Sequence, residues 1–496
     1  MTCFTLIFFA TALSLPFVFA DLRSSLTSAG ISAVFPGDES YTAASRAYNL
    51  RFTFEPAAVV YPTSPEDVSS IITAGLDNNL QVVARGGGHS YVANGLGGKD
   101  GSLVIDMSSM KSITIDSGVN TAIIETGNRL GDVALALNAA GRALPHGTCA
   151  NVGIGGHSAF GGYGFTSRQW GLALDPIFAI NAVLANGTIV RTTEDSDPDI
   201  FWALKGAAPS FAITTSIEVN TFAAPTYAIV MNYSWSDVDY KAAGSYLYSF
   251  QNFSLSGPAS PFAGELVLSR GSQEGLVSFV FTGAWYGDEG SAIPTLQPWL
   301  DVMPPPSSSS LVGNGSYIDS VAELSLPNSL NTSDAAASTS TFYAKSIMTP
   351  EGDPMTLEAC IALTEYLANQ GFFSNTNWFA EVELYGGPNS KISEIANDAT
   401  AFSRRDTLFT FQLHASSING LPPYPEEGFA FLDNMVNSIT SNMPPTWNYG
   451  AYTNYLDDEL QNWEKLYFDD NYARLRSIKD HLDPRGIFVF PTSIEE

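Results

Sequence analysis

The chain has 496 residues, of which 45% are hydrophobic, so it can bury a large core and should form two or more lobes. It carries 50 acidic residues against 22 basic ones, a formal net charge of −28 at pH 7. This charge makes nucleic acid and anionic membrane surfaces poor partners and favours a neutral small-molecule ligand. With five histidines in all and no zinc-type cysteine spacing, we expect no metal site.

The N-terminus has the pattern of a signal peptide. Residues 1–20 carry no charged side chain and hold a short apolar run that ends on Val-Phe-Ala, which predicts cleavage after Ala20. A membrane anchor is disfavoured because the run falls short of about 20 residues and contains Pro16. Asn-x-Ser/Thr acceptors occur at Asn186, Asn232, Asn252, Asn314 and Asn331. Together these features predict a secreted glycoprotein.

The first lobe is predicted from short strands and capped helices. Residues up to about 50 have the composition of a mobile segment. A strand at 57–62 precedes a helix capped by Ser64, and a strand at 81–84 leads directly into the motif Arg85–Tyr91, RGGGHSY. Ligands of α/β folds bind beyond the carboxyl ends of strands, so this motif is a candidate binding site.

The next predicted elements lead to a second glycine-rich stretch and beyond it. Short strands are expected at 103–106, 113–115 and 122–126, a helix at 130–140, a hairpin at 179–184 and 187–192, a helix at 197–206 and a strand at 211–219. Between the first helix and the hairpin lies Pro145–Trp170, where seven glycines fall within twenty residues. So much glycine costs conformational entropy but lets the backbone approach a ligand closely. The stretch is therefore expected to wrap a large, flat or phosphorylated ligand, with a flexible surface loop as the alternative.

The glycine-rich stretch also holds one of the three cysteines of the chain. Removal of the signal peptide would leave Cys149, in the middle of the stretch, and Cys360. Either the two form one disulfide or Cys149 has another task.

The texture of the chain changes near residue 220. From about Thr221 aromatic strands alternate with serine-rich loops, so we place the boundary between the lobes there. Met303–Ser310 is interpreted as a loop inside the second lobe. The tail predicts a helix from Tyr472 and then a strand over Ile487–Phe490, which would return the chain to the first lobe.

The order of strand, RGGGHSY, about sixty residues of small strands, PHGTCxxVGIGGHxxxGGYG and DIFWALKGA resembles the berberine-bridge-like branch of the vanillyl-alcohol-oxidase family of flavoproteins. Within that branch it is most similar to fungal secreted glucooligosaccharide and chitooligosaccharide oxidases. The resemblance covers essentially the whole mature chain. It implies an α+β fold of two lobes, with an FAD-binding domain of PCMH type at 21–220, an antiparallel-sheet substrate domain with helices at 221–450, and a return to the FAD-binding domain at 451–496.

The resemblance also implies how FAD is held. His89 would bond the 8α-methyl group of the flavin and Cys149 its C6 atom, while glycine N–H groups meet the pyrophosphate. The remaining cofactor-binding residues would be Arg85, Gly86, Gly87, Gly88, Ser90, Val152, Gly153 and Gly156. Val152 falls where the family gates oxygen access, and valine favours an oxidase, although a core valine is the alternative. His157 is either a packed histidine or a ligand contact.

For catalysis the resemblance points first to Tyr452-Thr453-Asn454-Tyr455. Tyr455 would act as the base, and a phenol with a pKa near 10 needs its ionisation eased by about 3 units or coupled to a second acceptor. A neighbouring carboxylate could be that acceptor. The alternative is that both tyrosines only pack against the flavin.

The second catalytic segment is Trp378–Gly387. Strand alternation puts Phe379, Glu381 and Glu383 on one face, and two carboxylates on one face suggest a functional site. The alternative is that this face is simply exposed to solvent. Related sugar oxidases carry aromatic-x-Gln-x-Asp here, so Glu383 matches the aspartate that assists the base. Glu381 departs from the glutamine and matches the glutamate of alkaloid-oxidising relatives. The proton acceptor therefore stays open between Tyr455, Glu383 and Glu381.

The expected substrate contacts are Tyr91, Phe379, Gln412 and Tyr452. The resemblance implies a secreted, monomeric FAD oxidase that converts the anomeric C1 hydroxyl of a neutral oligosaccharide to a lactone and reduces O2 to H2O2. The alternative within the same fold is an oxidase or cyclase of secondary metabolites such as alkaloids or polyketides. A catalytically silent flavoprotein is a third reading.

Overall fold

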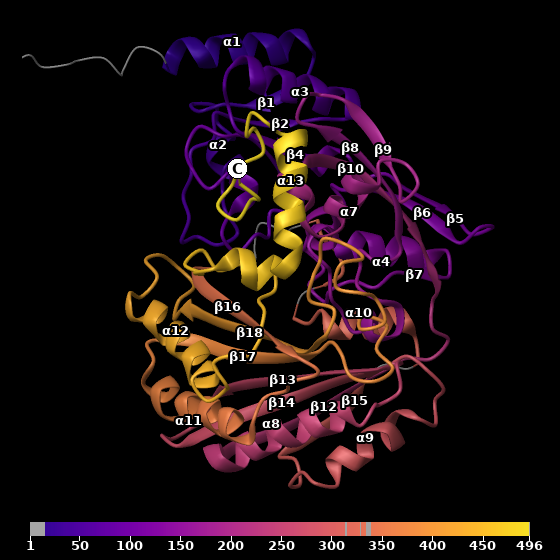
Figure 1. Cartoon of the computed structure of the whole chain (residues 1–496), viewed down its shortest axis with the longest axis vertical. Helices are drawn as coiled ribbons and strands as arrows, with labels where there is room; N and C mark the ends of the chain where they lie inside the picture. The colour runs from indigo at the N-terminus through magenta and orange to yellow at the C-terminus, as the bar shows by residue number, and fades with distance from the viewer. Residues whose placement is uncertain (1–14, 313–314, 328, 334–338, 496) are drawn as a thin grey trace, which may run out of the picture.

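Two groups of β-sheets, stacked along the longest axis of the molecule, make up the architecture (Figure 1). The computed structural model describes residues 15–312, 315–327, 329–333 and 339–495. One group holds four-, five- and two-stranded sheets built by residues up to Ala223, and the other is a seven-stranded sheet built by residues from Ile229 onward.

The four-stranded sheet carries the first glycine motif at its edge. Its order is β1 (Ser32–Val34), β2 (Ala58–Tyr61), β4 (Leu103–Asp106) and β3 (Val82–Arg85). Helix α3 (Pro65–Asp77) crosses from β2 to β3, so both strands run parallel to β4. As the sequence predicts, Ser64 caps this helix, because its Oγ accepts a hydrogen bond from the Asp67 N–H at 3.1 Å.

The five-stranded sheet positions the second glycine-rich stretch. Its order is β5 (Ile113–Asp116), β6 (Thr121–Glu125), β10 (Ala212–Asn220), β8 (Ile177–Leu184) and β9 (Ile189–Thr192). The elements around it are α4 (Leu130–Ala139), α5 (Ile154–Ala159), α6 (Ser167–Trp170), α7 (Pro198–Ala207) and the pair β7 (Arg142–Ala143) and β11 (Phe222–Ala223). The predicted strands and helices between residues 103 and 219 are thereby confirmed.

The seven-stranded sheet is antiparallel throughout. Its order is β15 (Ser308–Val312), β12 (Ile229–Asp239), β14 (Leu276–Trp285), β13 (Phe262–Arg270), β17 (Thr376–Leu384), β18 (Thr407–Ser417) and β16 (Phe342–Pro350). Helices α8 (Tyr240–Leu255), α9 (Ala292–Leu300), α11 (Leu357–Phe373) and α12 (Glu427–Thr440) lie along its lower face in Figure 1. That face packs a large apolar core, which includes Leu266, Val382 and Phe411. The opposite face is turned toward the other group of sheets, with α10 (Tyr317–Leu324) at its side.

The C-terminal segment leaves the large sheet and runs back beside α7. Helix α13 (Tyr472–Leu482) contacts α7, and its Leu475 and Ile478 join the same apolar core as Phe201 and Trp202. The predicted strand over Ile487–Phe490 is wrong. This segment is largely buried but irregular, and its backbone contact with β3 is the hydrogen bond from Val82 N–H to the Ile487 carbonyl at 2.9 Å.

Other sequence expectations also need correction. The segment before residue 50 contains α1 (Leu15–Ser28), β1 and α2 (Tyr41–Ala44), because Leu22, Leu26 and Phe35 are buried against the first sheet. The predicted cleavage site after Ala20 falls within α1, and residues 1–14 of the predicted signal peptide lie outside the described residues. Ser308–Ser310 belong to β15, an edge strand, rather than to a loop.

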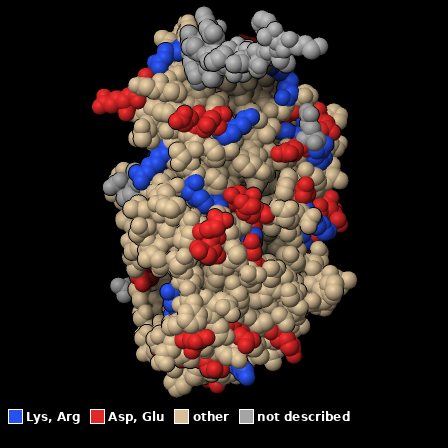
Figure 2. Space-filling view, turned by 90° about the vertical axis from the view of Figure 1, so that its left-hand side faces the viewer, with Lys and Arg blue, Asp and Glu red and all other residues tan. Residues whose placement is uncertain are grey.

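The surface carries the acidic charge without a broad basic area on the face shown in Figure 2. Among the described residues of that face, red and blue side chains are scattered singly or in small groups between uncharged ones. Within the described part of the chain no helix has both the length and the apolar character needed to cross a membrane.

Candidate functional site: two glycine motifs facing a buried carboxylate cluster

The two glycine-rich motifs cross each other in backbone contact. A Cβ atom on Gly87 would lie 2.3 Å from the Gly153 nitrogen, and one on Gly153 would lie 2.1 Å from the Gly87 nitrogen. Gly88 has φ +73°, a left-handed conformation that other residues adopt only with strain. Only glycine fits these positions, so this crossing brings the segments of His89 and Cys149 together.

The neighbouring predicted cofactor residues divide into two roles. The Arg85 guanidinium donates to the Asp106 carboxylate at 2.7 Å and to the Ala44 carbonyl at 2.6 Å, and Ser90 Oγ accepts from the Asn94 N–H at 3.1 Å. These side chains therefore fix the shape of the loop. At Gly156, by contrast, an added Cβ would meet nothing within 4 Å, so a bound group could approach the backbone closely.

Burial shifts the pKa values of His89 and Cys149 in opposite directions. The His89 ring stacks on Tyr48 with centroids 4.2 Å apart, and burial lowers its pKa to about 4, which keeps the imidazole neutral and nucleophilic. Cys149 is a free thiol that solvent can reach, although surrounding protein raises its pKa, mainly through desolvation. Cys360 is also free but buried in the large core, so the two do not form a disulfide.

Two further residues of the second motif are packing residues. His157 is buried and accepts a hydrogen bond from the Gly147 N–H at 3.0 Å, and burial lowers its pKa to about 3. Of the two readings of His157, the packed histidine is the one observed. Val152 is partly buried against the first-lobe core, and its N–H donates to the Cys149 carbonyl at 3.1 Å.

The C-terminal tyrosines differ in what their hydroxyl groups contact. Tyr452 is 2% exposed, and its Oη accepts from the N–H groups of Gly162 at 2.9 Å and Tyr163 at 3.1 Å. It therefore ties the C-terminal segment to the glycine motif, and its hydroxyl is not directed at the other predicted substrate residues. Tyr455 instead donates from Oη to Glu383 Oε1 at 2.9 Å.

Tyr455 lies in an aromatic and polar arrangement that includes two predicted substrate contacts. Its ring stacks nearly parallel to that of Tyr91, with centroids 5.9 Å apart, and Gln412 Nε2 donates to the Tyr91 hydroxyl. Burial raises the pKa of Tyr455 well above its ordinary value, and the charges of Glu383 and Glu381 raise it further. The phenol is thus protonated and donates its hydrogen bond to Glu383.

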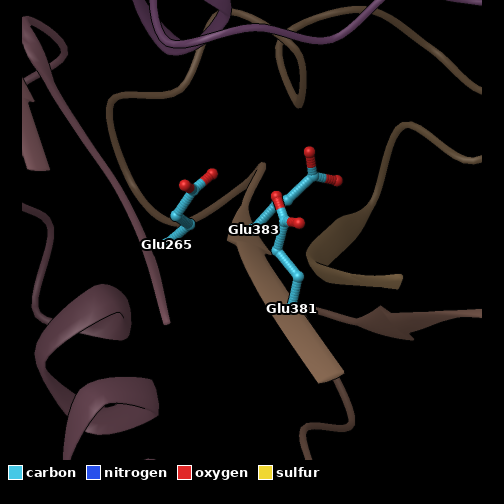
Figure 3. A group of neighbouring side chains, drawn as sticks. All are labelled: Glu265, Glu381 and Glu383. Carbon is cyan, nitrogen blue, oxygen red and sulfur yellow. The ribbon is translucent and has the colours of Figure 1, made fainter. Parts of the chain in front are cut away.

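Strands β13 and β17 bring three carboxyl groups together on one face of the sheet (Figure 3), and one of them, Glu383, is the partner of Tyr455. Glu265 lies directly opposite Glu383 in the strand register, and Glu381 lies two residues earlier on the same face of β17. One carboxylate oxygen from each of the three lies within 4.8 Å of one oxygen from each of the others. Burial raises the pKa of each of the three, and the negative charge of Glu381 raises those of Glu265 and Glu383 further.

The remaining predicted contact, Phe379, lies one step along this face from Glu381. Its ring stacks on His414 with centroids 4.8 Å apart, and His414 also contacts Phe342 at 4.7 Å. Sequence reasoning missed Glu265, although a lone acid inside the apolar strand Phe262–Leu268 is a signal that could have found it.

Two segments of the chain match known family models, and most of its length is similar to known oxidases. Residues 56–193 match the family model for the FAD binding domain, and residues 451–495 match the one described as berberine and berberine like. A xylooligosaccharide oxidase of Thermothelomyces thermophilus is 34% identical over 459 residues, 90% of this chain and 89% of that protein. The chain belongs to the berberine-bridge-like family of FAD-linked oxidoreductases. A chitooligosaccharide oxidase of Gibberella zeae is 33% identical over 485 residues, 96% of this chain and 94% of that protein.

Solved structures of this family share the whole fold. A chitooligosaccharide oxidase superposes with a TM-score of 0.88 at 32% identity, covering 96% of this chain and 99% of its own. A glucooligosaccharide oxidase from Acremonium strictum superposes with a TM-score of 0.87 at 31% identity, with the same coverage, and is described as carrying a 6-S-cysteinyl, 8α-N1-histidyl FAD. The predicted two-lobed α+β fold of vanillyl-alcohol-oxidase type is thereby confirmed.

Proposed function

We propose that this protein is a secreted FAD oxidase that converts the anomeric C1 hydroxyl of an oligosaccharide to a lactone. The observation that carries the proposal is the hydrogen bond from Tyr455 to Glu383, in a segment that Tyr452 ties to the second glycine motif. Bound FAD supplies the hydride acceptor and passes the electrons on to O2, giving H2O2. Support comes from relatives named for oxidation of xylo- and chitooligosaccharides.

The cofactor would be held by the crossing motifs. Gly87, Gly88 and Gly153 offer backbone N–H groups where no side chain fits, which suits a pyrophosphate. His89 and Cys149 would form the two covalent bonds to the flavin, since one is a neutral imidazole and the other a free, reachable thiol. We propose that Val152, bonded to the Cys149 carbonyl, stands at the oxygen entrance.

Proton removal from the sugar hydroxyl is assigned to Tyr455 together with Glu383. A preformed phenolate is excluded as the resting state because the pKa of Tyr455 is raised, not lowered. The phenol can instead take the substrate proton while its own proton passes along the 2.9 Å hydrogen bond to Glu383 Oε1. The raised pKa of Glu383 makes this carboxylate a stronger proton acceptor than an exposed one.

Other residues would orient the sugar. The Tyr91 ring offers a stacking surface whose hydroxyl is fixed by Gln412, and Phe379 continues the same sheet face beyond Glu381. Orientation by rigid groups of this kind contributes to rate by holding the reacting carbon in place.

We also propose that the enzyme acts outside the cell as a glycosylated monomer with domains 21–220, 221–450 and 451–496. Asn186, Asn252 and Asn331 are exposed acceptors, Asn232 is half-buried on β12, and Asn314 lies outside the described residues. Acidic surface charge fits a soluble secreted protein. Mass determination before and after glycan removal, on protein from the culture medium, tests these points together.

The activity test is a peroxide assay across cello-, xylo-, malto- and chitooligosaccharides, with an alkaloid panel beside it. We expect H2O2 with at least one sugar series, and silence on every sugar would overturn the proposal. Acid precipitation should carry the yellow colour into the pellet. Colour left in the supernatant would contradict covalent attachment.

A second candidate is oxidation of a secondary metabolite. Glu381 favours it, since alkaloid-oxidising relatives carry a glutamate at this position. Turnover of an alkaloid without turnover of any sugar would establish this candidate instead.

A further inference from the structure

Among the residues that the structure describes, buried acids are paired with bases, with one exception. Among the described residues four acids are buried: Asp106, Asp457, Asp483 and Glu383. Asp106 pairs with Arg85, Asp457 with Lys345 at 2.6 Å, and Asp483 with Lys479 at 2.7 Å. Glu383, which is 4% exposed, has no basic partner within the described chain.

The acids beside Glu383 also lack a basic partner among the described residues. Glu265 and Glu381 add two more carboxyl groups within 4.8 Å, and none of the ion pairs formed by described residues includes any of the three. Glu383 Oε1 accepts from Tyr455, but Oε2 is buried and has no hydrogen-bond partner. Buried carboxylates without a counter-charge are costly, and an unsatisfied oxygen adds to the cost.

This cluster faces the reaction site. Figure 3 shows the three carboxyl groups pointing to the same side of the sheet. Glu383 accepts from Tyr455 at 2.9 Å, and the Tyr455 ring stacks on that of Tyr91 with centroids 5.9 Å apart, so the cluster lies next to the residues assigned to proton removal and to the sugar. Glu265 and Glu381 are only partly buried, which leaves them accessible to a ligand.

We propose that the cluster of Glu265, Glu381 and Glu383 binds an ammonium group of the substrate. The preferred oligosaccharide would then carry a free amine next to the oxidised carbon, as a reducing-end glucosamine unit does. An ammonium brings one positive charge and three N–H donors, which matches three carboxyl groups with an unpartnered oxygen. The inference rests on the proposed function, and it replaces the neutral substrate expected from composition with one that bears a positive charge.

The test compares three trimers on the flavin-loaded enzyme: glucosamine, N-acetylglucosamine and glucose, all β-1,4-linked. Assays at about pH 6, where a sugar amine is protonated, with EDTA present, measure kcat/KM by peroxide release. We expect the glucosamine trimer to be preferred by about tenfold or more, as a charge-assisted bond allows. Glu381→Gln should remove most of that preference while keeping the side-chain shape.

Glu365→Gln is the matched control, since Glu365 is exposed on α11, which covers the other face of the sheet. It removes the same charge and should leave the preference unchanged. If Glu381→Gln fails to fold, Glu265→Gln serves in its place. Calorimetric binding of the trimers to the slowed Tyr455→Phe variant gives a readout that needs no turnover, and the glucosamine trimer should bind about tenfold more tightly.

The outcomes separate the two proposals. Oxidation of neutral trimers with equal or better kcat/KM, unaltered by Glu381→Gln, would overturn the ammonium inference and leave the sugar oxidase in place. Tight binding of the glucosamine trimer without oxidation of any sugar would support ammonium recognition and overturn the proposed activity. Equal binding of all three trimers, with no turnover, would overturn both.

Discussion

Two buried acids, Asp457 and Glu383, each accept a hydrogen bond from a tyrosine, yet their surroundings differ in charge. Tyr343 donates to Asp457 at 2.7 Å, and Tyr455 donates to Glu383 at 2.9 Å. Lys345 donates to both Asp457 and the Tyr343 hydroxyl, so the first acid is neutralised. The second is surrounded by other acids. The same tyrosine–carboxylate pair thus serves as a structural tie in one place and as a proton-accepting pair in the other.

The charge balance explains why only one pair suits catalysis. The charge of Asp457 is balanced by Lys345, so this pair serves to hold the fold together. Glu383, whose pKa is raised by burial and by Glu381, gains from accepting a proton. The structural pair lies close to the reactive one along the chain, since Asp457 follows Tyr455 by two positions. The ion pair of Lys345 and Asp457 therefore anchors the loop that holds Tyr455.

The largest expected effect comes from removing the reactive hydroxyl. Tyr455→Phe takes away the proton path to Glu383, so sugar-driven flavin reduction should slow by about a hundredfold or more, with FAD still bound. Stopped-flow absorbance of the flavin measures this. Tyr343→Phe is the matched control because it removes the same hydroxyl beside the neutralised acid. Similar rates for wild type and Tyr455→Phe would remove Tyr455 from its assigned role.

A difference in sign is expected for stability. Asp457→Asn leaves Lys345 buried with only the partly exposed Asp433 as counter-charge, and should destabilise the fold by about 3 kcal/mol. Glu383→Gln leaves no cation unpaired and should be neutral or stabilising. The folded state binds more protons at Glu383 than the unfolded chain, because its folded pKa is raised. Any stabilisation by Glu383→Gln should therefore grow as pH rises from the ordinary glutamate pKa of the unfolded chain to the raised pKa of Glu383 in the folded state.

Denaturant unfolding of both variants at two pH values checks this pair of effects. Equal losses in the two variants would mean that the Glu383 cluster is balanced by a partner after all.

The pH profile gives a smaller but more specific test. Activity should fall as pH falls through the raised pKa of Glu383, since the protonated acid cannot accept the proton from Tyr455. Glu381→Gln removes a neighbouring negative charge, which lowers the pKa of Glu383 and should move the acid limb of kcat/KM to lower pH. A neutral sugar is the substrate here, so that its own charge is constant. An acid limb that stays in place, as expected for Glu365→Gln, would contradict the coupling.

Features that depend on residues close together in the sequence could be predicted, and features that depend on contacts between distant segments could not. The glycine motifs and the alternation of Phe379, Glu381 and Glu383 depend on near neighbours, and both were predicted. Glu265 was missed because its place opposite Glu383 depends on strand register between distant segments. Tyr452 was interpreted as a substrate contact because its motif does not show that its hydroxyl is taken up by Gly162 and Tyr163.

The smallest effect concerns the second tie of the reactive loop. Ser346, next to Lys345 on β16, accepts from the Tyr452 N–H at 2.9 Å and donates to the Tyr455 carbonyl at 3.5 Å. Ser346→Ala should cost about 1 kcal/mol of stability and lower kcat a few-fold, because Tyr455 would be held less firmly against Glu383. Parallel unfolding and steady-state assays measure both, and Ser346→Thr, which keeps the hydroxyl, should restore kcat. A loss of stability with kcat unchanged would mean that the ion pair of Lys345 and Asp457 positions Tyr455 without help from Ser346.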